Sequence, residues 1–267
     1  MSIINSVKNF LLGTYFAKIL RNIQAWILYA RIPPLKSGVE RKTVYCISPY
    51  KTGTTYLARC FSSEISVHEP LHYLSLKLLN KNFDSFFARR MKHLNLKLEC
   101  SGAWSAYVNE LAQNEIAKDL EYICIIRTPS SWVASVINYW NTKLKQYKFE
   151  FVNELFWKKK VGVDLFEFQF GMDTKKNQEI IDKLIQFYFD FTKNTSLLKN
   201  VTYIKLKEID KNLPYVENLI NEISTTSNSY KNKSKEKLFV YENKSIDADY
   251  ELLMVKLIEE KNSNALK

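Results

Sequence analysis

Lys51, Gly53 and three threonines form a short cluster that could hold a phosphate group; the threonines are Thr52, Thr54 and Thr55. Lysine adds a full positive charge, the hydroxyls add hydrogen-bond donors, and glycine lets backbone N–H groups come close to an anion. In the P-loop of nucleoside triphosphate enzymes, the lysine follows the last glycine of G-x-x-x-x-G-K-[ST]. Here the lysine precedes the glycine by two residues, and no first glycine precedes it. The cluster therefore predicts a phosphate site of another kind.

A second anion-binding cluster begins at Arg127, which ends a strand-like run. Thr128 and Pro129 are typical of a helix N-cap and a first helical position. Ser135 follows Arg127 by eight residues, about two turns into the expected helix. An arginine meets a phosphate through two parallel hydrogen bonds and keeps its charge. Arg127 and Ser135 can therefore converge on one oxyanion group; the alternative is a capped amphipathic helix with an incidental arginine.

In this order, the two clusters resemble the cofactor motifs of sulfotransferases, which transfer sulfate from 3′-phosphoadenosine-5′-phosphosulfate (PAPS). The resemblance covers residues 43–140, about a third of the chain. It implies that residues 51–55 hold the 5′-phosphosulfate, with Lys51 stabilising the bridging and sulfuryl oxygens. It also implies that Arg127 and Ser135 hold the 3′-phosphate. PAPS would be the co-substrate, and no metal is expected, because sulfuryl transfer in this family needs none.

The segment S-V-H-E-P-L-H offers the general base that such a transfer needs. Pro70 disfavours the α region for the residue before it, so we expect Glu69 to be extended at a strand end and to point into the cleft. Carbohydrate sulfotransferases have a similar F-E-P-L, which implies Glu69 as the base and leaves His68 as a second candidate. Glu99, at the end of another strand-like run, is a third. The alternatives are an ion pair at Glu69 and a hydrogen-bonded histidine at position 68 or at His72.

The adenine end of PAPS has aromatic and basic candidates. Trp104, Trp132 or Phe239 could stack on the base, although a buried aromatic side chain is more often part of a core. In the family, a basic loop near the C-terminus covers the nucleotide. The resemblance suggests Lys233 and Lys235, in K-N-K-S-K-E-K, for this role. The family's usual R-K-G is missing here.

Residues 153–170 look like part of the bacterial sulfotransferases of capsular polysaccharide synthesis. Together with H-E-P-L at residues 68–71, this resemblance implies a carbohydrate hydroxyl as acceptor, on a capsular or surface polysaccharide. The K-T-H segment of the small-molecule sulfotransferases is absent, which argues against a phenol or steroid acceptor. Residues 141–176 follow neither a clear helix nor a clear strand pattern. We expect them to form an insertion against the acceptor side of the cleft.

Five apolar, β-branched runs predict strands, and helical stretches separate them. The runs are residues 43–48, 66–69, 95–100, 121–126 and 201–206. This alternation predicts a parallel sheet with helices on both faces, in one α/β domain over residues 1–267. The resemblance adds that the domain is a P-loop-like three-layer fold. Lys51, Glu69, Ser101 and Arg127 all follow expected strand ends, so one cleft at the carboxyl edge can hold them.

Composition excludes several classes of protein. The net charge of +11 allows a nucleic acid, an anionic lipid or an acidic glycan as partner, but no recognisable nucleic-acid module accompanies it, so nucleic acid is disfavoured. The four cysteines show no C-x-x-C spacing and predict no zinc site. Those inside strand-like runs are expected to be small buried core residues in a reducing compartment. They are Cys46, Cys124 and Cys100.

The N-terminal region is apolar but is interrupted by basic residues, and its longest uncharged stretch falls short of the roughly 18–20 residues that span a bilayer. It predicts an amphipathic helix within residues 1–35. The helix either packs on the domain or makes an interfacial membrane contact through Phe10, Trp26 and Tyr29. No signal peptide is evident. We therefore expect a cytoplasmic enzyme, which would lie at the inner face of the membrane if the helix is interfacial.

Two other functions compete with the sulfotransferase interpretation. A P-loop kinase would turn over ATP with Mg²⁺, but such enzymes usually hold the metal with an acidic residue at a strand end. The corresponding run here ends in Arg127, and residues 45–48 contain no acid. A non-catalytic anion-binding module would bind a nucleotide, yet it would lose nothing measurable on substitution of Glu69.

Overall fold

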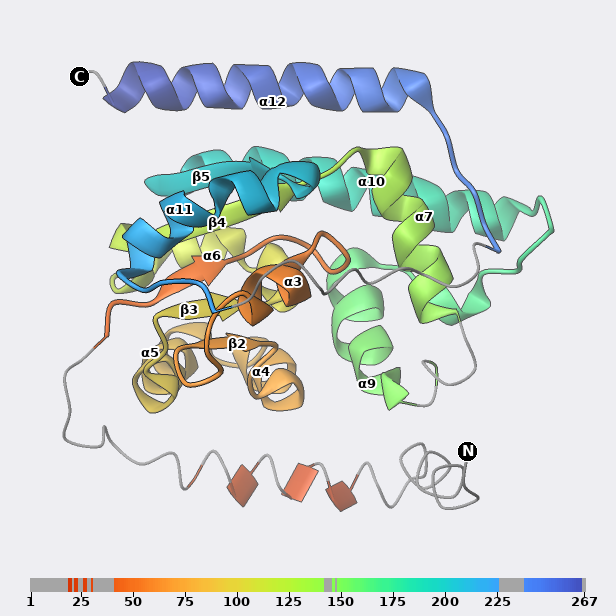
Figure 1. The fold of residues 1–267 in the computed structure, drawn as a ribbon. Coiled ribbons are helices and arrows are strands. Elements are labelled where there is room, and N and C mark those ends of the chain that lie inside the picture. Colours follow the sequence, from red (N-terminus) through yellow and green to blue (C-terminus); the bar gives the residue numbers. More distant parts are fainter. Residues whose placement is uncertain are drawn as a thin grey trace.

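One sheet of five parallel strands forms the centre of the protein (Figure 1). The computed structural model describes residues 41–141, 148–225 and 238–265, and also residues 19, 20, 22, 23, 26, 27, 30 and 146. The strands are β1 (Val44–Cys46), β2 (Ser66–His68), β3 (Leu98–Cys100), β4 (Glu121–Ile126) and β5 (Asn200–Lys205), in the spatial order β2-β3-β1-β4-β5. Each of the five predicted strands is present, so the predicted α/β class with an all-parallel sheet is confirmed.

The connections between the strands reverse direction beside β1. From β1 the chain crosses to the edge at β2 and returns through β3, and it then passes to β4 on the other side of β1. The connections that follow β1 and β4 therefore leave the sheet in opposite directions. In parallel sheets, such a reversal separates the loops at the carboxyl ends and leaves room for a ligand there. The two predicted anion clusters follow these two strands.

Both faces of the sheet are covered by helices, which is why its central strands are mostly apolar. Alternate side chains of β1 and β4 enter two separate cores, one packed against α3 and α11 and the other against most of the remaining helices. The helices of the first core are α3 (Thr54–Arg59) and α11 (Ile209–Ile220), with the short η6 (Leu206–Glu208) before α11. The cysteines at positions 46, 60, 100 and 124 are all free and buried, as predicted for the three in the strands.

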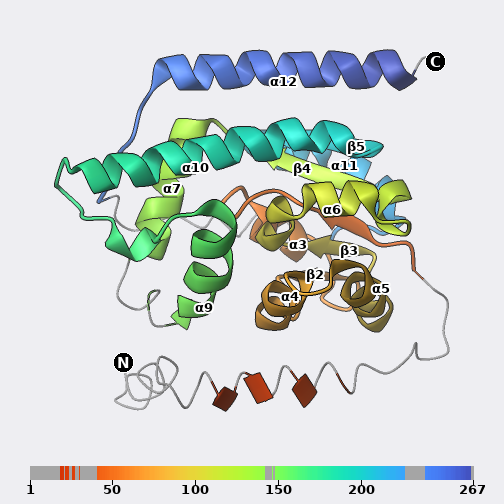
Figure 2. The same ribbon diagram turned by 180° about the vertical axis from the view of Figure 1, so that it is seen from behind.

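The helices of the second core follow the chain in four groups. After β2 come α4 (His72–Leu79) and α5 (Phe83–Leu94); after β3 come η1 (Gly102–Ala106), α6 (Val108–Gln113) and η2 (Ala117–Asp119); after β4 comes α7 (Pro129–Trp140). The C-terminal part adds α10 (Lys175–Asn194), η5 (Thr195–Leu197) and α12 (Lys244–Ala265). Figures 1 and 2 show α12 at the β5 end of the molecule and α4 and α5 at the β2 end.

The described part of the expected insertion is helical and contributes to the second core. It contains α9 (Glu150–Val152), the π-helix η3 (Asn153–Val161) and η4 (Leu165–Glu167). Phe156 and Trp157 are fully buried, and Phe156 packs edge-on against Tyr50 of the loop after β1, with ring centroids 4.8 Å apart. The segment is thus a wall beside that loop. Its position on an acceptor side stays a prediction.

Most of the predicted N-terminal helix lies outside the described residues. Those that are described between positions 19 and 30 are helical, and most of their side chains are exposed. None of the helices in the described ranges combines the length and the hydropathy that crossing a bilayer requires.

Candidate functional site

The loop between β1 and α3 has a conformation that its own sequence fixes. Lys51 and Gly53 both have left-handed backbones, with φ of 71° and 106°. Glycine adopts this region without cost, and a Cβ on Gly53 would also lie only 2.6 Å from Leu206 Cδ1. The hydroxyl of Thr52 donates to the carbonyl of Pro49 at 2.7 Å, and its side chain is buried. Thr52 therefore stabilises the turn, whereas the lysine, which is only partly buried, lies nearer the surface.

Arg127 joins the two predicted anion clusters. Its Nη1 donates to the carbonyl oxygen of Lys51 at 2.9 Å, and its Nε donates to Ser131 Oγ at 3.0 Å. Burial lowers the pKa of Arg127, although arginine stays charged at neutral pH. Nη2 donates to no side chain or carbonyl in the described part of the chain, so one edge of the guanidinium remains for another acceptor.

Ser135 lies between Arg127 and the lysine side chain along one face of α7. Ser131, Ser135 and Tyr139 are spaced four residues apart and share that face. Arg127 binds Ser131 at one end, and Lys51 Nζ lies 3.9 Å from the ring centroid of Tyr139 at the other. Ser131 and Tyr139 are eight residues apart, which is about 12 Å along the helix. The structure thus brings Lys51, Arg127 and Ser135 to one face of one helix, and no direct contact between Arg127 and Ser135 is seen there.

Glu69 is held at the carboxyl edge of the sheet by the loop that follows β3. Its Oε2 accepts the Ser101 hydroxyl at 2.6 Å, and its Oε1 accepts the backbone N–H of Gly102 at 2.7 Å. The predicted extended backbone is wrong, because Glu69 has φ of 53°. Pro70 disfavours only the right-handed α region for the residue before it. The left-handed backbone of Glu69 lets its carboxylate reach the loop after β3, while the Glu69 backbone N–H still donates to the carbonyl of Cys100.

Burial raises the pKa of Glu69, and the neighbouring His68 and the hydrogen bonds from Ser101 and Gly102 offset only part of this effect. A carboxyl group with a raised pKa suits general base catalysis near neutral pH.

His68 connects Glu69 with the first residues of α3. Its Nε2 lies 3.7 Å from Glu69 Oε1, and 3.2 and 3.1 Å from the hydroxyls of Thr54 and Thr55. Burial lowers the pKa of His68, and the proximity of Glu69 acts in the opposite direction. The two threonine hydroxyls, which the sequence predicts to bind an anion, thus already contact His68. Because its pKa is lowered, the imidazole of His68 is neutral at pH 7 beside the Glu69 carboxylate.

His72, which the sequence left as a structural alternative, is the second histidine beside Glu69. Its Nε2 lies 3.4 Å from Glu69 Oε2 and 2.7 Å from the hydroxyl of Tyr50. Burial, together with the positive charge of Arg90, lowers the pKa of His72 to about 3, so the ring is neutral at pH 7. Tyr50 belongs to the loop between β1 and α3, so His72 connects that loop with Glu69.

Strained backbone is concentrated at this edge of the sheet. Among the described residues, five non-glycine residues have positive φ, and two of them, Asn95 and Asn221, are helix C-caps, where asparagine commonly adopts this conformation. The other three are Lys51, Glu69 and Leu71. Such conformations persist where the surrounding structure enforces them, and they cluster at functional sites.

The third candidate base, Glu99, is a core residue, so this prediction is wrong. It is 1% exposed, and Arg90 binds both of its oxygens, at 2.6 and 2.8 Å. The indole of Trp104 donates to Glu99 Oε1 at 2.7 Å. A carboxylate in this environment cannot reach a substrate hydroxyl.

Two of the three candidates for adenine stacking are also wrong. Trp104 and Trp132 are fully buried, and the indole N–H of Trp132 donates to the carbonyl of Tyr50 at 2.8 Å. Phe239 is half-buried and packs on Phe168, with ring centroids 4.9 Å apart. The predicted basic residues, Lys233 and Lys235, lie outside the described residues.

Gly102 is a site residue that sequence reasoning missed. Its N–H binds Glu69, and a Cβ added to it would lie 2.8 Å from the backbone nitrogen of Tyr50 and 2.4 Å from Tyr50 Cδ1. Only its place directly after Ser101, at a strand end, could have indicated it.

We expect Gly102→Ala to lower the free energy of unfolding by about 1–3 kcal/mol, because the methyl group forces the loop that contains Tyr50 away from the loop after β3. Urea unfolding followed by circular dichroism measures this change. An unfolding free energy equal to that of the native chain would show that the two loops are not packed as described.

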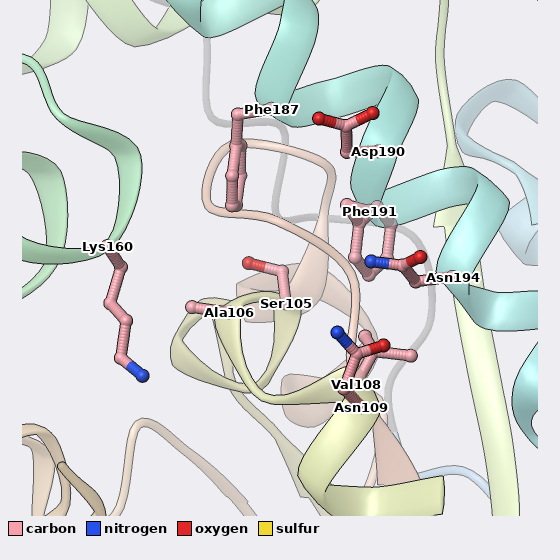
Figure 3. A pocket seen from close by; sticks show the side chains of 9 residues that line it. All are labelled: Ser105, Ala106, Val108, Asn109, Lys160, Phe187, Asp190, Phe191 and Asn194. Atoms are coloured by element: carbon pink, nitrogen blue, oxygen red, sulfur yellow. The ribbon is translucent and has the colours of Figure 1, made fainter.

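A cavity of about 110 Å³ lies elsewhere, between α10 on one side and η1 and α6 on the other (Figure 3). Phe187 and Phe191 line it from α10, and Lys160 lies at its edge. None of its lining residues belongs to the cluster around Glu69. In the residues that the structure describes, no group of three or more His, Cys, Asp or Glu side chains is arranged to hold a metal ion.

Comparisons of the chain with known protein families, with curated proteins and with solved structures gave no match.

Proposed function

We propose that the protein is a sulfotransferase that moves a sulfuryl group from PAPS to a hydroxyl of a carbohydrate. The observation that supports this most is the hydrogen bond from Arg127 to the carbonyl of Lys51, at 2.9 Å. It joins Arg127, after β4, to the backbone of Lys51, after β1, and so fixes the position of the two loops relative to each other at the carboxyl edge. A co-substrate with two phosphate groups needs two such sites at a fixed separation.

The order of the five strands is compatible with the P-loop-like three-layer fold that we propose for the domain. The loop after the central strand would hold the 5′-phosphosulfate through its backbone N–H groups and Lys51. Arg127 and Ser135 would hold the 3′-phosphate.

The residues around Glu69 can support the transfer itself. The acceptor hydroxyl gives its proton to Glu69, and its oxygen forms a bond to sulfur while the bond between sulfur and the 5′-phosphate oxygen breaks. Lys51 then stabilises the charge that develops on the departing phosphate, which leaves as adenosine 3′,5′-bisphosphate. His68 is the second candidate base, because its neutral ring lies beside both the carboxylate and the first residues of α3.

A carbohydrate is the acceptor class that the sequence favours, and aromatic side chains near the site fit it. Phe151 packs edge-on against His72, with ring centroids 5.3 Å apart. Phe151 is only partly buried, and sugars offer apolar ring faces to such aromatic side chains. A bacterial capsular or surface polysaccharide is the acceptor that we propose.

The deciding experiment is a calorimetric titration of the purified protein with adenosine 3′,5′-bisphosphate, and separately with ATP and Mg²⁺. Binding of the bisphosphate alone supports the sulfotransferase site and justifies a screen of glycan acceptors with PAPS. Binding and turnover of ATP would make the protein a P-loop kinase instead. Bisphosphate binding without transfer to any glycan, and without any effect of substitutions at Glu69, would make it a nucleotide-binding module.

We expect Arg127→Ala to weaken bisphosphate binding by about 2–3 kcal/mol, because a charge-assisted pair with phosphate is lost and the Lys51 carbonyl loses its donor. The same titration measures this change. Lys199→Ala, which removes a surface lysine paired with Asp119 before β5 begins, serves as the control and should bind like the native chain. An unchanged affinity of Arg127→Ala would overturn the assignment of the 3′-phosphate site.

A further inference from the structure

The described N-terminal residues carry an exposed apolar stripe, which we define as Ile19, Leu20, Ile23, Trp26 and Ile27. These residues are helical, and their side chains are between 38% and 59% exposed. A spacing of three and four residues places them on one side of a helix. Soluble domains rarely expose such a contiguous group of large apolar side chains unless the group contacts a membrane or a protein.

Among the described residues, one that contacts the rest of the protein is polar and lies outside the stripe. Asn22 Oδ1 accepts the hydroxyl of Tyr73 at 2.5 Å and also accepts Lys77 Nζ, both from α4. Of the two alternatives that the sequence left open, a helix packed on the domain would bury its apolar side. In the described residues a carboxamide makes this contact, and the side chains of the stripe stay largely exposed to solvent.

The charge around the stripe is strongly positive. Residues 1–42 contain seven lysines and arginines and a single acidic residue, Glu40. The other exposed apolar row, Leu252, Val255 and Ile258 of α12, has the opposite surroundings, since residues 244–261 contain five acidic and three basic residues. Figures 1 and 2 show α12 at the opposite end of the molecule from α4. Of these two rows, the N-terminal stripe is the one that lies in a basic stretch of sequence.

We propose that this stripe lies in the headgroup region of an anionic lipid bilayer, with the neighbouring lysines and arginines paired with lipid phosphates. The combination of an apolar side that contains tryptophan and isoleucine with basic residues around it is typical of helices that lie in the membrane interface. The basic residues interrupt the apolar sequence too often for a span. The inference does not depend on the proposed sulfotransferase activity.

Sedimentation with lipid vesicles tests the proposal. The full chain should sediment with vesicles of equal parts phosphatidylcholine and phosphatidylglycerol, less with phosphatidylcholine alone, and less at high salt. Ile23→Ser combined with Ile27→Ser should weaken this binding by about tenfold or more, because two apolar anchors are lost. The matched control is Leu252→Ser combined with Val255→Ser on α12, which should bind like the native chain. Thermal unfolding of each variant shows whether it is folded.

Three outcomes would overturn the proposal. In the first, the native chain remains in solution with both kinds of vesicle, and in the second the two double variants lose binding equally. In the third case, analytical ultracentrifugation would find a native dimer that Ile23→Ser with Ile27→Ser converts to a monomer. The stripe would then be covered by a second copy of the chain and not by lipid.

Discussion

Glu69→Gln should slow sulfuryl transfer by about 10²- to 10⁴-fold and leave the affinity for adenosine 3′,5′-bisphosphate nearly unchanged. Glutamine has the size of glutamate, and its carbonyl oxygen can still accept the N–H of Gly102, so the loop after β3 has no reason to move. The amide, however, cannot take the proton of an acceptor hydroxyl. Turnover with PAPS and a glycan acceptor, together with calorimetry of the bisphosphate, separates the two effects.

The pH dependence of the native enzyme gives a second measurement of the same group. Because burial raises the pKa of Glu69, the carboxylate is protonated at a higher pH than an exposed glutamate, and turnover should fall as the pH drops through this raised value. Glu69→Gln should lack this limb of the profile. The raised pKa favours folding while the group is protonated, and this contribution is lost as the pH rises through the folded-state pKa. Glu69→Gln should therefore raise the free energy of unfolding at neutral pH.

His68→Gln is the matched control, because it removes the neighbouring titratable group and keeps a polar side chain of similar size. If Glu69 is the base, His68→Gln should retain most of the turnover and the acid limb of the profile. Full turnover in Glu69→Gln, with a loss in His68→Gln, would assign the base to His68 instead. Equal retention in both would leave the cluster without a role in proton transfer and would contradict the proposed mechanism.

Arg90→Ala should lower the free energy of unfolding by about 3–5 kcal/mol, because it leaves the carboxylate of Glu99 buried without its positive partner. Both oxygens of Glu99 accept from Arg90, and the Arg90 guanidinium also donates to Ser75 Oγ at 2.8 Å and to the carbonyl of Pro70 at 3.0 Å. The bond to Pro70 supports the chain directly after Glu69, so turnover should fall as well. Urea unfolding at neutral pH measures the stability change.

The double variant Arg90→Met with Glu99→Met tests the reason for the loss. It removes both charges and keeps similar side-chain volume, and replacing a buried ion pair by apolar residues is often close to neutral. We expect it to recover more than half of the stability that Arg90→Ala loses. A double variant as unstable as the single one would show that the loss comes from packing and not from the stranded carboxylate.

The strands and their ends could be predicted because local composition determines them. In a buried parallel sheet, each strand is an apolar run that stops at a polar or turn residue, and the polar residues at Lys51, Glu69, Ser101 and Arg127 follow such runs. The carboxyl ends of parallel strands meet at one edge, so their proximity follows from the fold class alone. The hydrogen bonds from Ser101 to Glu69 and from Arg127 to Lys51 agree with that expectation.

Neighbouring residues in the sequence could not show that Glu99 is a core residue paired with Arg90, whereas Glu69 lies at the carboxyl edge of the sheet. Both follow or end an apolar run, and what separates them is the placement of Arg90, on a helix whose orientation depends on the packing of α5 against α4. The same holds for the contact between Tyr50 and His72, which are 22 residues apart. Glycine is required at position 102 because the loops after β1 and β3 come too close there for a Cβ. This close approach arises only when β1 and β3 pair.

The order β2-β3-β1-β4-β5 has a consequence for synthesis on the ribosome. The first three strands to emerge can form one half of the sheet by themselves, and β4 and then β5 each add to an edge that already exists. We therefore expect the nascent chain to assemble in the order in which it is made. Until β4 is complete at Ile126, however, β1 presents an unpaired, apolar edge. The interval between β3 and β4 is the time at which the chain most needs protection from aggregation.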